Sequence, residues 1–326
     1  MVSIIITYYA GLNILKSNLA LLFEQNLSDI EIIIVNDNPS IPLTKDMLCI
    51  SQDNKIQIVT MPQNGGYAAA CNYGVKHSKG ELLIFMDSDI LVSPDWMGQL
   101  LDAYYSVENC GAVSTTILNL NQKKIVHWGL AMNKGMEVIK PFRDGVLPDK
   151  LKHGIYEFNM ASSGCILIPK NIFYKVDGYD EQFYNGFCDL DLTYKITQQG
   201  YKCVYSSDAI VYHRGKVSGT TRTAAEDDTR ALFMKKWAKN YLDDGYKVEL
   251  LYLPLSPFSP IFLPTFSYFF VLLFLEKQRE QAVMLTLFAI LARILLCCRT
   301  QLSSLASNLF SLQTYIFQHR PPSPCI

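Results

Sequence analysis

The sequence predicts an α/β protein in which a mostly parallel sheet is covered by helices on both faces. Short apolar and β-branched runs alternate with segments of helical periodicity through the first half of the chain. These runs are mostly apolar at successive positions, as expected for strands that are buried on both faces. The 326 residues are enough for one large domain, or for one domain with an appendage.

Strands and helices are expected to alternate along the chain. Apolar runs predict strands at residues 2–8, 31–35, 56–61, 81–86 and 111–115, and helical periodicity predicts helices at residues 12–25, 67–77 and 94–107. The second half predicts strands at residues 161–168, 202–205 and 210–212, and helices at residues 171–176, 190–199 and 223–240. Because helices separate most of the early strands, we expect a Rossmann-like, doubly wound sheet.

The charge balance argues against a nucleic-acid partner. Lys and Arg total 29 and Asp and Glu total 30, so no basic excess is available to neutralise a phosphate backbone. Nine cysteines are scattered without a CxxC pair, which predicts a reducing compartment. The first residues lack the features of a signal peptide, and we therefore expect a cytoplasmic location.

The composition changes near residue 249. We expect a first domain over residues 1–248 and an apolar helical extension over residues 249–326. Apolar stretches at residues 261–275 and 281–298 are shorter than the roughly 20 residues that a bilayer-crossing helix needs. The pattern favours peripheral contact of residues 250–298 with the inner face of the cytoplasmic membrane. A spanning helix, or a helical hairpin buried against the first domain or a second copy, is the alternative.

Polar residues follow four of the predicted strands at the point where each strand ends. In sheets of this kind, ligands bind at the carboxyl ends of the strands. The GxGxxG pattern of dinucleotide folds and the GxxxxGK[ST] pattern of P-loops are both absent. The four polar clusters are residues 7–9, 36–38, 63–66 and 87–89.

The last of these clusters, Asp87-Ser88-Asp89, directly follows an apolar strand. Paired carboxylates at a strand end can hold Mg²⁺ or Mn²⁺, which is commonly bound by one or two carboxylates together with phosphate oxygens. The alternative is structural, because aspartates also cap turns and helices.

Five segments in order resemble the inverting family 2 glycosyltransferases, which have the GT-A fold and include enzymes of bacterial glycan synthesis. They are SIIITYY at residues 3–9, EIIIVND at 31–37, NGGYAAACNYG at 64–74, DSD at 87–89, and GYDE at 178–181 followed by DLDL at 189–192. The resemblance spans residues 2–215. It implies transfer of a sugar from a nucleotide-diphosphate donor to a hydroxyl of a glycan or lipid-linked acceptor, with inversion.

The resemblance also assigns roles to the first clusters. Thr7, Tyr9 and Asp37 would face the nucleotide, and Asn64 and Gly65 would let the backbone approach it closely. The structural alternatives are that Asp37 is an ordinary turn residue and that the Asn-Gly-Gly segment is a simple tight turn.

A divalent metal, Mn²⁺ or Mg²⁺, would be held by Asp87 and Asp89, and His213 matches a histidine that contributes to metal binding in several family members. Asp87 would thereby also contact the donor. Arg214, Lys216 and Arg222 follow in a loop that could pair with the diphosphate, although basic loop residues are often only solvated.

An inverting transfer also needs a base, and the resemblance points to Asp189. It lies at the start of a predicted helix, whose positive end favours an ionised carboxylate. Asp191 is expected to orient neighbours or to cap the helix. Relatives commonly have Glu, Asp or Asn immediately before the base, whereas this chain has Cys188, which puts the support of Asp189 in question.

Two alternatives to the enzyme remain open at this point. One is a binding protein for nucleotide sugars that uses the same scaffold without catalysis. The other is a nucleotidyltransferase, which would need a basic, glycine-rich loop after the first strand that residues 7–11 do not supply. His127-Trp128 offers an aromatic face for a sugar ring, or else packs in the core.

Overall fold

The structure is a computed structural model. It describes residues 1–25, 27–50, 55–121, 124–133, 135–139, 153–214, 221–245 and 247, without the side chains of residues 139 and 221–227. Residues 1–253 group into one compact unit. The apolar stretches at residues 261–275 and 281–298 lie outside the described residues, as does Lys216.

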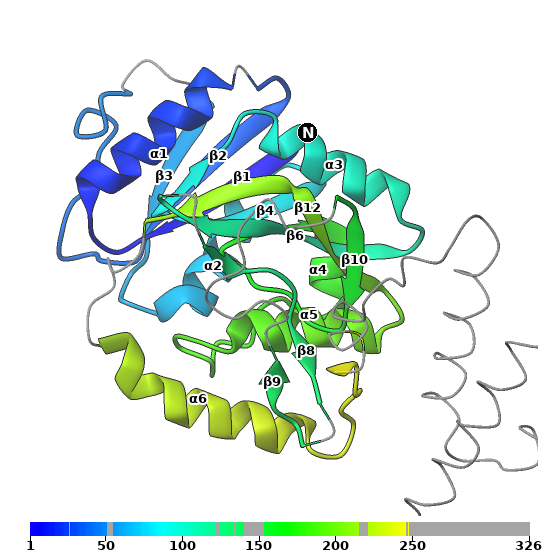
Figure 1. Cartoon of the computed structure of the whole chain (residues 1–326). Coiled ribbons are helices and arrows are strands. Elements are labelled where there is room, and N and C mark those ends of the chain that lie inside the picture. Colours follow the sequence, from blue (N-terminus) through cyan, green and yellow to red (C-terminus); the bar gives the residue numbers. More distant parts are fainter. Residues whose placement is uncertain are drawn as a thin grey trace, which may run out of the picture. The chain divides into compact units, whose positions relative to one another are not determined.

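A ten-stranded sheet forms the centre of the described part of the chain (Figure 1). Its main path runs β10-β12-β6-β11-β4-β1-β2-β3, with β5 paired to β12 and β7 paired to β6. A separate small sheet pairs β8 with β9. The strands are β1 (Val2–Tyr8), β2 (Ile30–Asn36), β3 (Ile56–Thr60), β4 (Leu82–Asp87), β5 (Ile90–Val92), β6 (Cys110–Asn119), β7 (Ile125–His127), β8 (Ala131–Met132), β9 (Val138–Ile139), β10 (Ile155–Phe158), β11 (Cys165–Pro169) and β12 (Lys202–His213).

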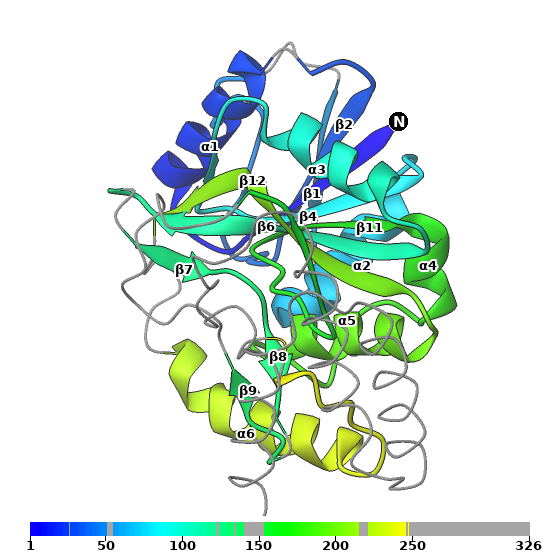
Figure 2. The same ribbon diagram turned by 45° about the vertical axis from the view of Figure 1, so that its right-hand side comes forward.

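Helices cover both faces of this sheet (Figure 2). They are α1 (Leu12–Glu24), α2 (Gly66–His77), α3 (Trp96–Ser106), α4 (Lys170–Lys175) and α5 (Cys188–Gln198), whereas α6 (Thr221–Trp237) packs against α5. Alternate residues of β1 separate the two hydrophobic cores: Ile4 and Ile6 pack with α1 and α3, whereas Ile5 packs with α2, α4 and α5. Burial on both faces explains why the centre of the strand, Ile4 to Ile6, is apolar at successive positions.

The predicted α/β class is confirmed, with a mixed sheet whose first half is parallel. Strands β1, β2, β3 and β4 pair in parallel, whereas β11 lies antiparallel between β4 and β6. The runs predicted at residues 202–205 and 210–212 form one strand, β12, which contains a register shift after Ser206. A bulge lets a strand continue in spite of a break in its apolar pattern.

The sequence pattern missed β5, β7, β8, β9 and β10. All of them have four residues or fewer, so none shows a periodicity that can be recognised. Strands β5 and β10 pair with the distant strand β12, whereas β7, β8 and β9 pair with strands close by in the chain. Within the described ranges, the structure contains no helix that is both long enough and apolar enough to cross a membrane.

Candidate active site

A cavity of about 280 Å³ opens where strands β1, β2 and β4 end. This is the edge at which the polar clusters were expected. The predicted residues that line it are Thr7, Tyr9, Asp37, Asn64, Asp87, Asp89, Asp189 and His213. Gly65 lies next to the lining residue Gly66. Arg222 belongs to α6, and its side chain is outside the described part of the chain.

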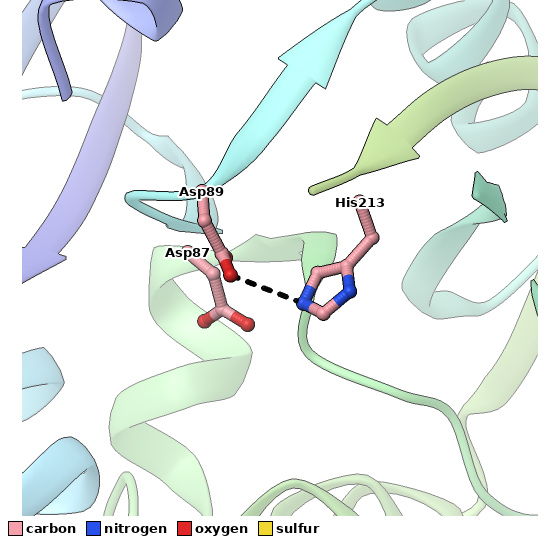
Figure 3. Close-up of side chains that lie close together, drawn as sticks. All are labelled: Asp87, Asp89 and His213. Atoms are coloured by element: carbon pink, nitrogen blue, oxygen red, sulfur yellow. Dashed lines mark ion pairs between the residues drawn. The ribbon is translucent and has the colours of Figure 1, made fainter. Parts of the chain in front are cut away.

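Asp87, Asp89 and His213 meet at one end of the cavity. Each offers one ligand atom, and these atoms lie within 4.8 Å of one another. The Nε2 atom of His213 is 3.3 Å from an Asp89 carboxylate oxygen, and the three side chains converge in Figure 3. The short strand β5 accounts for this geometry, because Ile90 pairs with His213 itself and holds the turn after β4 against the end of β12.

The chemistry of this cluster suits a divalent cation. Two carboxylate oxygens and one imidazole nitrogen are ligands that Mn²⁺ accepts, and Mg²⁺ accepts the carboxylates. All three side chains are partly buried, so they are shielded from bulk water but still reach the cavity.

Asn18 of α1 supports this end of the cavity from beneath. Its side chain is fully buried, and its Nδ2 atom donates a hydrogen bond of 3.4 Å to the backbone carbonyl of Asp87. The sequence carried a signal for this residue, because Asn18 is polar within the buried stripe formed with Leu15, Leu19 and Leu22. Its contact with Asp87 is a tertiary feature that the sequence pattern does not predict.

Asp189 lies in the first turn of α5 and faces the cavity. One carboxylate oxygen accepts a hydrogen bond of 3.1 Å from the Ser163 amide, and the other accepts one of 3.0 Å from the Leu190 amide. Both bonds favour the charged carboxylate, as does the start of the helix. Ser163 is a lining residue that sequence analysis placed only in a strand.

Asp191 has a different environment, although it is only two residues away. Its side chain is 0% exposed, and it accepts hydrogen bonds from Lys236 and from the Trp237 indole, the latter at 3.0 Å. Lys236 also forms an ion pair of 2.7 Å with Asp180. Burial raises the pKa of Asp191, and Lys236 opposes that shift. Asp191 therefore anchors α6 to α5, in line with an orienting role.

Asp37 organises the other end of the cavity. Its two carboxylate oxygens accept hydrogen bonds from the amides of Gly65, at 2.8 Å, and Gly66, at 3.0 Å. Asn64 donates to the Asp37 carbonyl at 3.1 Å. Burial raises the pKa of Asp37, and the two amides oppose the shift. Asp37 thus holds the Asn-Gly-Gly turn, as the structural alternative predicts, and it also lines the cavity.

Two tyrosine rings line this same end. Tyr9 is 54% exposed and Tyr184 is 42% exposed, and the Tyr184 hydroxyl donates to Asn64 Oδ1. Burial raises the pKa of Tyr184, and the nearby Asp37 and Tyr9 add to the shift. Tyr184 was missed by sequence analysis because it lies between two matching motifs rather than within one.

Two further predictions concern residues that are buried. Cys188 lines the cavity floor, and burial followed by the charge of Asp189 raises the pKa of its thiol well above the ordinary range. A neutral thiol therefore lies beside Asp189.

Trp128 is 2% exposed, and the centre of its ring lies 4.5 Å from that of Tyr156. It therefore belongs to the core and does not present a face to a sugar.

Comparison with known families gives one match. The model of the family described as glycosyl transferase family 2 matches residues 3–166. This range is half of the chain, and it contains the Asp37 turn, the Asp87-Ser88-Asp89 motif and Ser163.

Curated relatives carry names from bacterial polysaccharide synthesis. The O-antigen biosynthesis protein RfbC of Myxococcus xanthus is 25% identical over 234 residues, which cover 70% of this chain and 18% of RfbC. The succinoglycan biosynthesis protein ExoW of Rhizobium meliloti is 25% identical over 183 residues, which cover 53% of this chain and 56% of ExoW. For RfbC and three rickettsial glycosyltransferases, the alignment covers 18–31% of the relative's length.

Solved structures share the fold. GalNAc-T7, crystallised with UDP, GalNAc and Mn²⁺, has a TM-score of 0.59 at 16% identity, covering 74% of this chain and 48% of that chain. The mannosyltransferase PcManGT of Pyrobaculum calidifontis, in complex with GDP-Man and Mn²⁺, has a TM-score of 0.51 at 16% identity and covers 89% of this chain and 80% of that chain. These likenesses confirm the predicted GT-A type of fold.

Proposed function

This chain belongs to glycosyl transferase family 2, and we propose that it transfers a sugar from a nucleotide-diphosphate donor to a hydroxyl of a glycan or lipid-linked acceptor, with inversion at the anomeric carbon. One observation carries the proposal: a single cavity is lined by the Asp87, Asp89 and His213 cluster and by Asp189. Such a transfer needs a group that stabilises the leaving diphosphate and a base that accepts the proton of the acceptor hydroxyl.

The metal-ligating end takes the diphosphate. Asp87, Asp89 and His213 would hold Mn²⁺ or Mg²⁺, and a divalent cation there supplies positive charge against the charge that develops on the leaving group. Arg214 follows directly, with its amide donating to the Asp89 carbonyl at 3.1 Å, and Arg222 is proposed to contribute further positive charge. Thr7, Tyr9, Asp37, Asn64 and Gly65 form the remainder of the donor site.

Asp189 acts as the general base. It accepts the proton of the acceptor hydroxyl while that oxygen forms a bond to the anomeric carbon from the face opposite the diphosphate. The bond between the anomeric carbon and the diphosphate oxygen breaks, and the diphosphate leaves with the electron pair. The amides of Ser163 and Leu190 hold the two carboxylate oxygens in place.

The acceptor is proposed to be a growing bacterial polysaccharide or its lipid-linked precursor. The names of RfbC and ExoW, which refer to O-antigen and succinoglycan biosynthesis, support this class.

We propose that the reaction takes place in the cytoplasm. A C-terminal unit that begins near residue 249 would contact the inner face of the membrane through residues 250–298. Co-sedimentation of the full chain with lipid vesicles is expected, and recovery of the protein in the supernatant in their presence would contradict this contact.

A thermal-shift screen tests the proposed function. UDP, GDP, dTDP and CMP sugars are added to the full chain with and without Mn²⁺, and a ligand that binds only the folded state raises its melting temperature. We expect one nucleotide class to stabilise the protein, and more strongly with Mn²⁺. Stabilisation by none of them under either condition would refute the proposal.

Transfer to an acceptor then separates an enzyme from a binding protein. Asp189→Asn should abolish transfer while metal-dependent nucleotide binding persists, because Asp189 lies outside the metal-ligating cluster. Wild-type protein that binds a donor but neither hydrolyses nor transfers its sugar would favour the binding protein.

A further inference from the structure

A short segment, residues 184–189, runs along the cavity from one end to the other. Tyr184, Asn185, Gly186, Cys188 and Asp189 all line it. Tyr184 lies at the end organised by Asp37, whereas Asp189 contacts Ser163, next to the start of β11. The end of the cavity near Asp37 and the proposed general base Asp189 are therefore connected by one continuous stretch of chain.

From this arrangement we infer that Tyr184 binds the nucleoside part of the donor. The inference rests on the proposed function, because it assumes a nucleotide donor in this cavity. It adds a residue from the second half of the chain, outside the matched range of residues 3–166, to a nucleoside site otherwise built from the segments after β1, β2 and β3.

The position of Tyr184 is held by three contacts to the start of α2. Its hydroxyl donates to Asn64 Oδ1, its carbonyl accepts a hydrogen bond of 3.1 Å from the Tyr67 amide, and its ring packs on Gly66. Gly66 has a φ of +78°, and a Cβ atom there would lie 2.4 Å from the Tyr184 carbonyl oxygen. Only glycine fits at that position, so the close packing of Tyr184 on this turn requires glycine at residue 66.

The chemistry of this end suits a nucleoside rather than a diphosphate. It presents two exposed phenol rings, Tyr9 and Tyr184, beside the Asn64 amide and the Asp37 carboxylate. Aromatic faces stack on any base, and carboxylate and amide groups hydrogen-bond ribose or base edges. The metal-ligating cluster lies on β4 and β12, on the other side of β1 from Asp37, so an anionic diphosphate has its partners there.

The segment also links Tyr184 to the base. Gly186 and Phe187 have φ angles of 93° and 59°, which turn the chain sharply into α5. The Phe187 ring packs on Phe233 of α6, with 5.5 Å between ring centroids, so this end of the segment is anchored independently. Tyr184 is therefore held by α2 and Asp189 by α5, with a tight connection of four residues between them.

Isothermal titration calorimetry on the full chain tests the inference. UDP, GDP and dTDP are titrated in the presence of Mn²⁺, and inorganic pyrophosphate with Mn²⁺ serves as the probe that lacks a nucleoside. Tyr184→Ala should weaken the tightest nucleoside diphosphate by about 10- to 100-fold, the range for losing one stacked base. Pyrophosphate affinity should stay unchanged.

Tyr184→Phe keeps the ring and removes the hydroxyl that donates to Asn64. We expect a smaller loss of about fivefold, as for one hydrogen bond. Tyr174→Ala is the matched control, because Tyr174 is also an exposed tyrosine, at 54% against 42% for Tyr184, and lies on α4 without lining the cavity. If Tyr184→Ala fails to fold, Tyr184→Leu, which keeps apolar bulk but no aromatic face, takes its place and should show the same selective loss.

Two results would overturn the inference while leaving the proposed function intact. One is unchanged nucleotide affinity in Tyr184→Ala, and the other is an equal loss for nucleotide and pyrophosphate. A wild-type chain that binds pyrophosphate with Mn²⁺ but no nucleoside diphosphate would instead overturn both, as would one that binds neither probe.

Discussion

The chain contains two Asp-x-Asp motifs with opposite fates. In Asp87-Ser88-Asp89, both carboxylates line the cavity and share it with His213. In Asp189-Leu190-Asp191, only the first carboxylate lines the cavity, whereas the second is fully buried against Lys236 and Trp237. The same spacing thus produces a pair of ligands in one region and two separate roles in the other.

Backbone geometry explains the difference. The first motif begins with the last residue of β4 and continues into the turn before β5, and this turn brings both carboxylates to the cavity. The second motif lies in the first turn of α5, where residues two apart point to different sides of the helix. The spacing of two acidic residues therefore predicts shared chemistry only once the local secondary structure is known.

The largest effect is expected from Asp189→Asn. Removing a general base typically costs about 10²- to 10⁴-fold in rate, and the variant should keep its fold and its metal-dependent nucleotide affinity. Turnover with the natural acceptor, or donor hydrolysis, measures the loss. Asp191→Asn is the matched control in the same helix turn, and it should lower the melting temperature rather than the nucleotide affinity.

Asp89→Asn tests the other motif. We expect a loss of about 10²- to 10³-fold in rate, comparable with removing one electrostatic stabiliser of a developing charge. Unlike Asp189→Asn, this variant should also need more Mn²⁺ for half-maximal activity and for thermal stabilisation by nucleotide. Retention of the wild-type Mn²⁺ dependence would show that Asp89 is not a ligand and would remove the contrast between the motifs.

Lys236→Met removes the nearer of the two lysines that pair with the buried Asp191 carboxylate, and leaves Lys195 at 3.9 Å. Breaking a buried pair costs roughly 3–5 kcal/mol, and we expect a loss of about 3 kcal/mol in unfolding free energy because Lys236 is itself 30% exposed. Chemical denaturation at neutral pH measures it.

The stability of Lys236→Met should also depend on pH. Burial raises the pKa of Asp191, and without Lys236 the pKa rises further. Because the folded-state pKa then lies above the unfolded value, the folded state binds more protons between the two values, and stability falls as pH rises through that window.

In wild type the pKa of Lys236 is also raised, because its two carboxylate partners outweigh burial. Lys236 is therefore charged throughout acidic and neutral pH. The gap between wild type and variant should therefore be small near about pH 4 and widen toward about pH 7. A constant gap would contradict this assignment.

The smallest effect is expected from Asp180→Asn. Asp180 shares Lys236 with Asp191, and burial of its carboxylate is outweighed by hydrogen bonds from Lys236 and the Gln182 amide, so its pKa is lowered. A lowered pKa stabilises the fold above the unfolded value, and this contribution is lost as pH falls through the folded value. Because the pair is partly exposed, we expect a loss of about 1 kcal/mol or less at neutral pH. A loss as large as that of Lys236→Met would mean that Asp180, not Asp191, is the main partner.

The sequence predicted the parts of the fold that depend on local pattern. The bounds of β1 are those expected from its apolar run, and α2 begins one residue earlier than predicted. The strand-end clusters at residues 7–9, 36–38 and 87–89 could be placed at one edge because parallel strands point the same way. Helix α6 ends at Trp237 rather than Asn240, within the usual uncertainty of helix ends.

Local pattern could not predict contacts between distant parts of the chain. The pairing of the three-residue strand β5 with β12 brings Asp89 to His213, and a strand so short has no periodicity of its own. Trp128 reads equally well as a core residue or as a sugar-binding face, and only its packing against Tyr156 decided for the core.

By itself, the sequence determined the α/β class, the succession of the early strands along the chain, and the acidic and aromatic residues available at their ends. The tertiary structure alone decided which of these residues meet: Tyr184 with Asn64, Asp191 with Lys236, and Asp189 with the Ser163 amide. The physical reason is that hydrophobic periodicity is set within a few residues. Pairings across tens of residues are chosen by the packing of the whole domain, in which each contact depends on the others.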